Sequence, residues 1–194
     1  MTDPSYWSAQ RCLAALRSRE ISSFELVEAC IARVEERNPS LNAVVAKDYE
    51  RARECARRSD DARLAGRDLG PLHGLPMTVK DALQTAGLVT TSGAPSLRDF
   101  VPDEDAVAVE RALGAGAIIL GKTNLPMCAG DWQTYNAVYG QSNYRWDDNR
   151  TVGGASGGSA ASLGAGFVPL EIGFEICGSS RNASHYCGVY GHKP

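Results

Sequence analysis

One lysine stands where an amine can act as a base. Lys80 ends the run Leu75-Pro-Met-Thr-Val79, which is apolar and predicts a buried strand. An amine drawn into an apolar setting has a lowered pKa, and in its neutral form it can accept a proton. Asp81 follows directly, so an ordinary ion pair is the alternative interpretation of this lysine.

Two serines lie in glycine-rich segments. Ser179 stands in Cys177-Gly-Ser-Ser-Arg181 after a predicted strand, and such a turn can aim several N–H groups at one point, as an oxyanion requires. Ser156 stands in Gly154-Ala-Ser-Gly-Gly158, which matches G-x-S-x-G, the nucleophile elbow of α/β-hydrolases. That elbow needs an apolar strand directly before it, and residues 147–151 are polar. The elbow is therefore the weaker interpretation of Ser156.

Two further glycine-containing segments match common patterns, a phosphate-binding loop and a flexible linker, and their neighbouring residues argue against both. Residues 116–123 match G-x₄-G-K-[ST], a phosphate-binding pattern. Their four intervening residues are apolar and strand-forming, and Asn124-Leu-Pro126 follows where a helix should begin. A strand and turn are favoured there. Residues 153–166 have the composition of a flexible linker, but an apolar strand follows them, which indicates a structured segment.

The elements that position these residues alternate between helices and strands. Ser22-Ser-Phe-Glu25 is a capping box, Asn38-Pro39 is expected to end the helix behind it, and Asp103 is expected to begin a later helix. This alternation predicts an α/β fold with a mixed, largely parallel central sheet flanked by helices. The expected helices cover 8–19, 22–38, 47–65 and 103–113, and the expected strands cover 41–46, 75–80, 117–120 and 168–172. Residues 1–65 are expected to form a helical outer layer, and 70–194 the catalytic sheet and its active-site motifs.

Composition excludes several classes of protein. The 194 residues carry a net charge of −3, which argues against a nucleic-acid partner, and no apolar run is long enough for a membrane helix. Six arginines lie between Arg51 and Arg67, but interleaved acidic residues favour a solvated helix face over a basic patch. The six cysteines have no C-x-x-C spacing, and the first ten residues do not show the pattern of a signal peptide, so we expect free thiols and a cytoplasmic protein.

Several segments together resemble a known family in their order and spacing. They are Gly74-Leu-Pro-Met-Thr-Val-Lys80-Asp81, Gly116-Ala-Ile-Ile-Leu-Gly-Lys-Thr-Asn124, Gly153-Gly-Ala-Ser-Gly-Gly-Ser159, and Gly173 through Arg181 with Tyr186-Cys-Gly-Val-Tyr-Gly-His-Lys-Pro194. On these segments the chain resembles the N-terminal part of an amidase signature enzyme. The resemblance implies a truncated amidase signature fold that hydrolyses the C–N bond of a small-molecule amide, with no metal or cofactor. It leaves a homodimer open.

The resemblance also implies roles for individual residues. In such enzymes a lysine is the base, a serine held by a cis peptide relays the proton, and a second serine attacks the carbonyl carbon. Lys80 matches the base and Ser179 matches the nucleophile. The amides of Ile176, Cys177 and Gly178 match the oxyanion hole.

The chain departs from the family where the relay serine is expected. That residue should lie 24 positions before the nucleophile, where this chain has Ala155. Without a hydroxyl the direct proton path is broken, and general acid–base assistance is worth roughly 10²–10⁴ in rate. Ser156 is the candidate substitute relay, directly or through a water. The family also favours glycine at Cys177, and a small polar residue and Asp at Phe174 and Glu175.

Two other functions stay open at this point. A non-catalytic remnant of an amidase is one, because the relay hydroxyl is missing and family members are much longer. The amidase subunit of a tRNA-dependent amidotransferase is the other.

Overall fold

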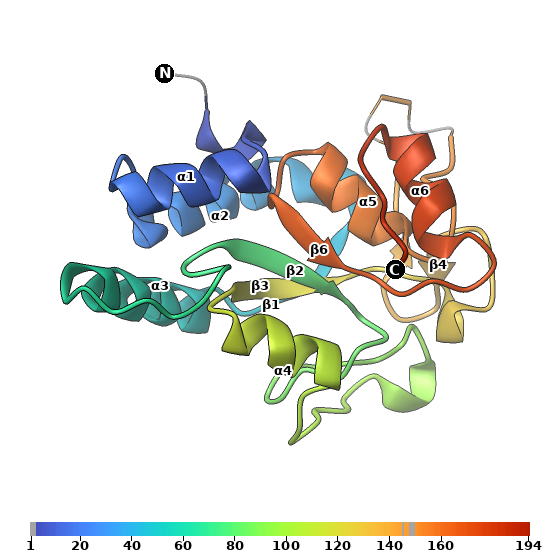
Figure 1. Ribbon diagram of the computed structural model, residues 1–194. Helices are drawn as coiled ribbons and strands as arrows, with labels where there is room; N and C mark the ends of the chain where they lie inside the picture. The colour runs from blue at the N-terminus through green and yellow to red at the C-terminus, as the bar shows by residue number, and fades with distance from the viewer. Residues whose placement is uncertain (1–2, 145, 148–149) are drawn as a thin grey trace.

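A four-stranded sheet forms the centre of the computed structural model, which describes residues 3–144, 146–147 and 150–194 (Figure 1). Its strands lie in the order β1 (Val44–Lys47), β3 (Ile118–Thr123), β2 (Pro76–Lys80), β6 (Leu170–Ile172). β1 pairs antiparallel with β3, whereas β3–β2 and β2–β6 are parallel. The predicted mixed, largely parallel α/β sheet is therefore confirmed.

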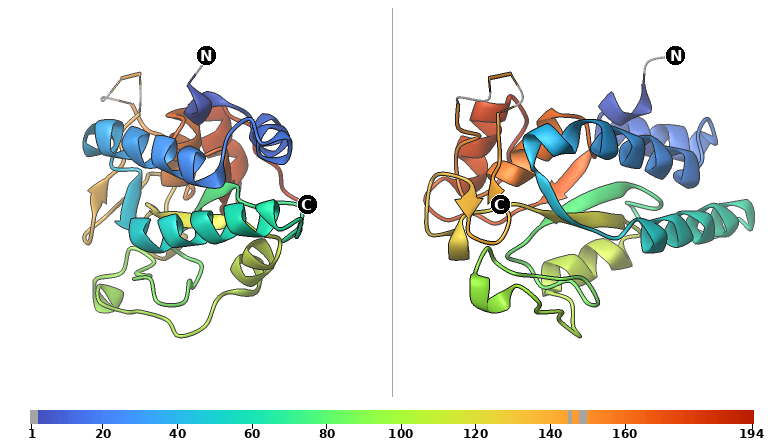
Figure 2. Two further views of the ribbon diagram at one scale, coloured as in Figure 1. Left: turned by 90° about the vertical axis from the view of Figure 1, so that its left-hand side faces the viewer. Right: turned by 180° about the vertical axis from the view of Figure 1, so that it is seen from behind.

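Helices cover both faces of the sheet. The α-helices are α1 (Ala9–Ser18), α2 (Ser23–Leu41), α3 (Tyr49–Leu64), α4 (Val107–Gly114), α5 (Gly157–Gly164) and α6 (Ser179–Cys187). Short 3₁₀ turns lie at Pro4–Tyr6, Pro95–Leu97 and Met127–Ala129, and β4 (Tyr135–Asn136) pairs with β5 (Gly140–Gln141). Helix α4 lies on one side of the sheet, and α1, α2 and α5 lie on the other, as the views in Figures 1 and 2 agree.

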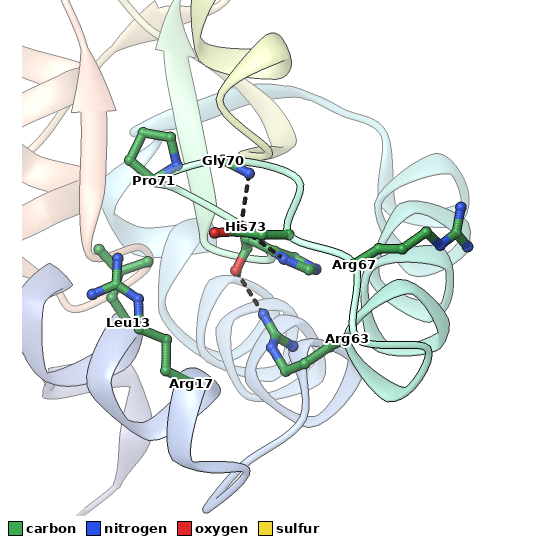
Figure 3. Close-up of a pocket in the computed structure, with 9 residues that line it drawn as sticks. Leu13, Arg17, Arg63, Arg67, Gly70, Pro71 and His73 are labelled. Carbon is green, nitrogen blue, oxygen red and sulfur yellow. Dashed lines mark hydrogen bonds and ion pairs between the residues drawn. The ribbon is translucent and has the colours of Figure 1, made fainter.

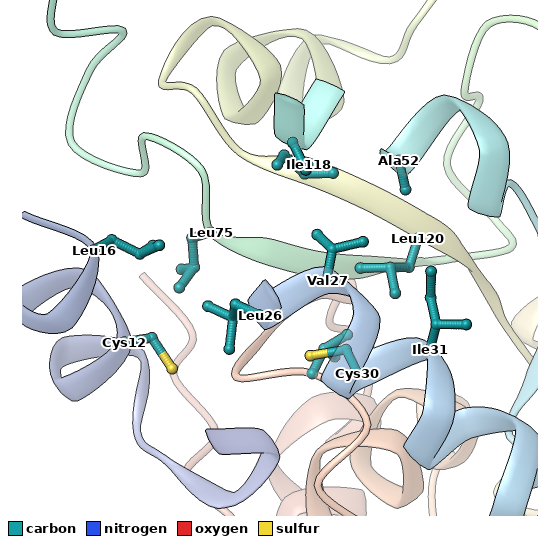
Figure 4. Packing of buried hydrophobic residues seen from close by; sticks show 12 residues of the cluster. Cys12, Leu16, Leu26, Val27, Cys30, Ile31, Ala52, Leu75, Ile118 and Leu120 are labelled. Carbon is teal, nitrogen blue, oxygen red and sulfur yellow. The ribbon is translucent and has the colours of Figure 1, made fainter. Parts of the chain in front are cut away.

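The main hydrophobic core fixes the strand that carries Lys80. Leu26 and Val27 of α2 pack with Leu75, which directly precedes β2, and with Leu120 of β3 (Figure 4). Burying one such side chain contributes about 1.5–3 kcal/mol. Successive residues of a strand face opposite sides of the sheet. Met77 and Val79 of β2 pack with α4 residues, so Thr78 and Lys80 face α5.

Helix α2 runs past the point where we expected it to end. Pro39 lies inside its last turn, and Asn42, in the left-handed region with a φ of 50°, terminates the helix by donating its N–H to Asn38 O at 2.7 Å. A proline so near the C-terminus removes one helical N–H and does not prevent the final turn. The expected strand at 41–46 is accordingly displaced to β1.

Asp103 does not cap α4, so that expectation was wrong. The N-cap is Ala106, whose side chain cannot accept a hydrogen bond. The neighbouring Asp105 carboxylate instead accepts the N–H of Ala86 at 2.8 Å, which fixes the loop after β2. The capping box at Ser22 and Glu25 is present as predicted.

The two ambiguous glycine segments are both structured. Residues 118–123 form β3, and the buried Lys122 ammonium donates to Leu83 O and to the hydroxyls of Thr85 (3.1 Å) and Thr90 (2.9 Å). A lysine so engaged inside the fold does not face a phosphate. Residues 157–164 form helix α5, which excludes a linker there.

The expectation of free thiols is confirmed. All six cysteines are free. Within the described residues, no helix combines the length and apolarity that a bilayer crossing requires.

Candidate active site

Lys80, Ser156 and Ser179 meet at one point. They come from the end of β2, the N-cap of α5 and the first residue of α6. Lys80 Nζ lies 3.0 Å from Ser156 Oγ and 3.2 Å from Ser179 Oγ, and the two Oγ atoms are 2.8 Å apart. Their exposed fractions are 0%, 2% and 3%. The three residues form a buried triangle in which each polar atom is within hydrogen-bond distance of the other two.

The surroundings of Lys80 favour the neutral amine at mildly alkaline pH. Burial lowers the pKa of Lys80 to about 8, and the Glu171 and Glu175 carboxylates oppose this by stabilising the ammonium. With this pKa, about one tenth of the amine is neutral at pH 7. Lys80 is thus able to act as a base near neutral pH.

Ser156, not residue 155, supplies the hydroxyl between the lysine and Ser179. Ala155 is buried and has no donor or acceptor on its side chain. The backbone turns through Gly153 and Gly154, with φ of 69° and 47°, and the described residues contain no cis peptide bond. Ser156 Oγ is also 3.3 Å from the carbonyl oxygen of Phe174.

The amides expected to form an oxyanion hole are not all free. Gly178 donates its N–H to the Glu175 carboxylate, and Ser179 donates its N–H to Ile176 O at 3.1 Å. Among the described residues, the amides of Ile176 and Cys177 meet no acceptor. The structure therefore leaves two of the three expected amides, those of Ile176 and Cys177, available to bind an oxyanion.

The Glu175 carboxylate holds the start of α6. It accepts the N–H groups of Ser180 at 2.7 Å and Arg181 at 3.2 Å, and pairs with the Arg181 guanidinium at 3.2 Å. Burial alone would raise the pKa of Glu175. The hydrogen bonds from these donors lower it by more than burial raises it, so the net pKa lies below the ordinary value. An ionised carboxylate is therefore bound in the turn that precedes Ser179.

Our sequence reasoning missed Glu171, which lies on β6 opposite Thr78. Its carboxylate accepts the hydroxyls of Thr123, at 2.8 Å, and Thr78. Burial raises the pKa of Glu171 to about 7. The available signal was a single acidic residue inside the apolar segment at 168–172.

A cavity of about 320 Å³ adjoins the triangle. Ser156, Glu171, Gly173 and Ser180 contribute to its wall. This volume lies at the lower end of the range for small-molecule sites, about 300–1,000 Å³. A substrate group in this cavity would lie next to the Ser156 hydroxyl.

A second cavity, of about 250 Å³, shares no lining residue with the first (Figure 3). Arg17, Arg63 and His73 contribute to it. Arg63 donates to His73 O at 2.8 Å, and His73 Nε2 is 2.8 Å from Ser59 O. These contacts hold α3 to the loop before β2, so both Arg63 and His73 have structural partners.

The fold and the triangle define a class: an α/β protein with a buried lysine hydrogen-bonded to two serines. The family model described as Amidase matches residues 25–194. The chain therefore belongs to the amidase family, the amidase signature enzymes.

Individual relatives agree with this membership. The chain is 39% identical over 194 residues to a glutamyl-tRNA(Gln) amidotransferase subunit from Chloroflexus aurantiacus, covering all of this chain and 40% of that protein. It is 44% identical over 180 residues to the corresponding subunit from Azoarcus sp. (strain BH72), covering 93% of this chain and 37% of the other. The chain thus spans about two fifths of the length of these relatives.

Solved structures show the same architecture. 6-Aminohexanoate cyclic dimer hydrolase superposes with a TM-score of 0.85 at 35% identity, over 95% of this chain and 37% of that one. A bacterial aryl acylamidase superposes with a TM-score of 0.81 at 32% identity, over 86% of this chain and 35% of that one.

Proposed function

We propose that this chain carries the base and the serines of an amidase that hydrolyses a carboxylic amide. The observation that carries the proposal is the pair of contacts from Lys80 Nζ to Ser156 Oγ and Ser179 Oγ, at 3.0 and 3.2 Å. A lysine with a pKa near 8 can accept a proton from a serine without histidine.

In the proposed reaction Ser179 is the nucleophile and Ser156 is the relay. Neutral Lys80 takes the proton of Ser156, which takes that of Ser179 across their 2.8 Å separation. Ser179 Oγ then attacks the amide carbon, and the carbonyl π electrons move to oxygen. The ammonium returns the proton through Ser156 to the leaving nitrogen, and the C–N bond breaks. Water then hydrolyses the acyl ester of Ser179.

The developing oxyanion is proposed to bind the amides of Ile176 and Cys177, which meet no acceptor within the described residues. Preorganised donors of this kind are worth about 2.7–4 kcal/mol each in transition-state stabilisation. The amide of Gly178 joins them only after it leaves Glu175. The cavity beside Ser156 is proposed to hold part of a small, non-peptide amide.

A fluorophosphonate probe tests the proposal directly, because it labels only an activated serine. We expect an adduct on Ser179 in this chain, identified by peptide mass mapping, and its loss in Ser179→Ala and Lys80→Met. Circular dichroism confirms that each variant is folded. A folded chain that takes no label would instead support a non-catalytic remnant.

A second candidate function is that of the amidase subunit of a glutamyl-tRNA(Gln) amidotransferase. The observation that favours it is the name of the Chloroflexus and Azoarcus relatives, at 39% and 44% identity. Coexpression with the remaining subunits of such an enzyme, followed by copurification on a tag placed on this chain, tests it. Recovery of this chain alone would remove this candidate.

A further inference from the structure

The ring of Phe174 lies against the amine of Lys80. Lys80 Nζ is 4.3 Å from the ring centroid. The carbonyl oxygen of the same residue lies 3.3 Å from Ser156 Oγ and 3.2 Å from Ser180 Oγ. One residue of the segment between β6 and α6 therefore contacts both the proposed base and the hydroxyl beside it.

Both contacts favour the charged form of the lysine. The face of an aromatic ring attracts a cation, and the attraction grows where water is excluded, as it is around the buried Lys80. When Ser156 donates its proton to Phe174 O, its lone pairs are left to accept from the ammonium. In this arrangement Lys80 cannot act as the base, because a base must present a lone pair rather than a proton.

Two carboxylates and burial also act on the charge of the Lys80 amine. Glu171 of β6 and Glu175 of the following segment favour the ammonium, and burial favours the amine. The adjacent Asp81 is directed elsewhere, since its carboxylate accepts the Thr91 hydroxyl at 2.6 Å. Glu171, whose pKa is about 7, changes charge close to the range in which Lys80 titrates, whereas Glu175 and the ring do not. The contribution of Phe174 is therefore constant across the pH range in which Lys80 titrates.

We infer that Phe174 is a positioning residue for Lys80, whose ring holds the amine protonated and moves proton removal from the serines to higher pH. The ring does not contact the reacting serine oxygens in any step of the proposed reaction and acts only through the lysine. The consequence for catalysis rests on the proposed function, but the effect on Lys80 is measurable without any activity.

The chain provides its own control, because its four lysines are Lys47, Lys80, Lys122 and Lys193. Lys122 is as buried as Lys80, and burial lowers its pKa to about 8 as well. It donates to Leu83, Thr85 and Thr90 and pairs with Asp81 at 3.9 Å, and it has no contact with Phe174 among the described residues. In ¹³C-lysine-labelled chain, the Cε resonance of each lysine reports its titration, and Lys80→Met and Lys122→Met assign the two buried ones.

The variant Phe174→Leu keeps an apolar side chain over Lys80 and removes the aromatic face. We expect the titration midpoint of Lys80 to fall by about half to one and a half pH units, with Lys122 unchanged. Phe174→Tyr keeps the ring and should keep the midpoint. An unchanged Lys80 in Phe174→Leu would overturn the inference, as would an equal shift of Lys122, which would indicate a general change in packing.

Labelling of Ser179 by the fluorophosphonate gives the second readout. In Phe174→Leu its pH profile should move to lower pH by the same amount while the plateau rate is retained. A lowered plateau with an unmoved profile would mean that Phe174 only supports the fold, and would overturn the inference. If the unsubstituted chain takes no label at any pH, the proposed function fails while the NMR result still decides the role of Phe174.

Discussion

Ser156 Oγ and Ser179 Oγ lie 2.8 Å apart, close enough for one hydroxyl to pass a proton to the other. Lys80 Nζ completes the path at 3.0 Å from Ser156. Although Ala155 has no hydroxyl, the proposed nucleophile Ser179 therefore still has a hydroxyl beside it, that of Ser156. A path to the lysine runs through the next residue along the chain, beside the direct contact of Ser179 Oγ with Lys80 Nζ at 3.2 Å.

Removal of the Ser156 hydroxyl is expected to abolish the relayed path and to leave only the direct contact of Ser179 Oγ with Lys80 Nζ. In Ser156→Ala, the rate constant for fluorophosphonate labelling of Ser179 should fall by about 10²–10⁴, the value of general acid–base assistance. Stopped reactions analysed by mass spectrometry measure this rate. Ser162→Ala is the matched control, because Ser162 is a buried serine of α5 whose hydroxyl lies near Thr78 at 3.5 Å. Equal rates in both variants would contradict a relay at Ser156.

Loss of the Glu175 carboxylate should loosen the turn before Ser179. The carboxylate accepts N–H groups at the start of α6, as an N-capping side chain does, so Glu175→Ala should destabilise the chain by about 0.5–2 kcal/mol. Urea unfolding measures this change. Amide hydrogen exchange should become faster at Gly178, whose N–H loses its acceptor. Glu54→Ala, an exposed substitution within α3, should have little effect on either measurement.

The lysine and the two serines of the site were predictable from the sequence, whereas the geometry between them was not. Lys80 ends an apolar strand and the serines stand in glycine-rich turns, but each setting alone left an ordinary interpretation open. The resemblance to the amidase signature family brought the three residues together. Which of two consecutive residues faces the lysine depends on backbone torsions at Gly153 and Gly154. Glycine permits many such torsions, and for this reason the residue types alone did not decide whether Ser156 reaches the lysine directly or through a water.

The fold was predictable where periodicity is strong and less so at element ends. The capping box at Ser22 marked the start of α2 correctly, but Pro39 did not mark its end. That end depends on the Asn38 side chain, which donates to Val44 O at 2.8 Å and accepts from the Ala43 N–H at 2.9 Å. The hydrogen bond from the Gly178 amide to Glu175 spans only three residues, but it depends on the left-handed backbone at Cys177 and Gly178, which the residue types did not specify.

Cys177 occupies a backbone conformation that favours glycine, with a φ of 53°. The left-handed region costs a residue with a Cβ roughly 1–2 kcal/mol, and glycine avoids this cost. Part of the resulting stabilisation is lost, because glycine has a larger conformational entropy in the unfolded chain. We expect Cys177→Gly to raise the free energy of unfolding by about 0.5–1 kcal/mol. Cys55→Gly, inside helix α3, should lower it by about 1 kcal/mol. Urea unfolding of both variants checks that the two changes in the free energy of unfolding have opposite signs. Destabilisation by Cys177→Gly would show that the turn is not strained.

Glu171 should make stability fall as pH rises through neutrality. Burial raises its pKa from 4.5 to about 7, so between these values the folded chain holds a proton that the unfolded chain has lost. The stabilisation is complete below pH 4.5 and is lost as pH rises through 7. Relative to Glu171→Gln, which does not titrate, the unsubstituted chain should lose up to about 3 kcal/mol between pH 4.5 and 7.5.

Urea unfolding of both chains at half-unit pH steps measures this difference. Lys80 and Lys122 have pKa values of about 8, so ending the series at pH 7.5 keeps them mostly charged throughout. Glu35→Gln is the control of opposite sign, because hydrogen bonds from Lys47 and Tyr49 lower the pKa of Glu35. Its carboxylate stabilises the chain above pH 4.5, so the stability that this substitution removes should already be present at the start of the series and stay nearly constant up to pH 7.5. A Glu171→Gln chain whose stability follows the unsubstituted chain at every pH would show that Glu171 is ionised in the fold across this range, as in the unfolded chain.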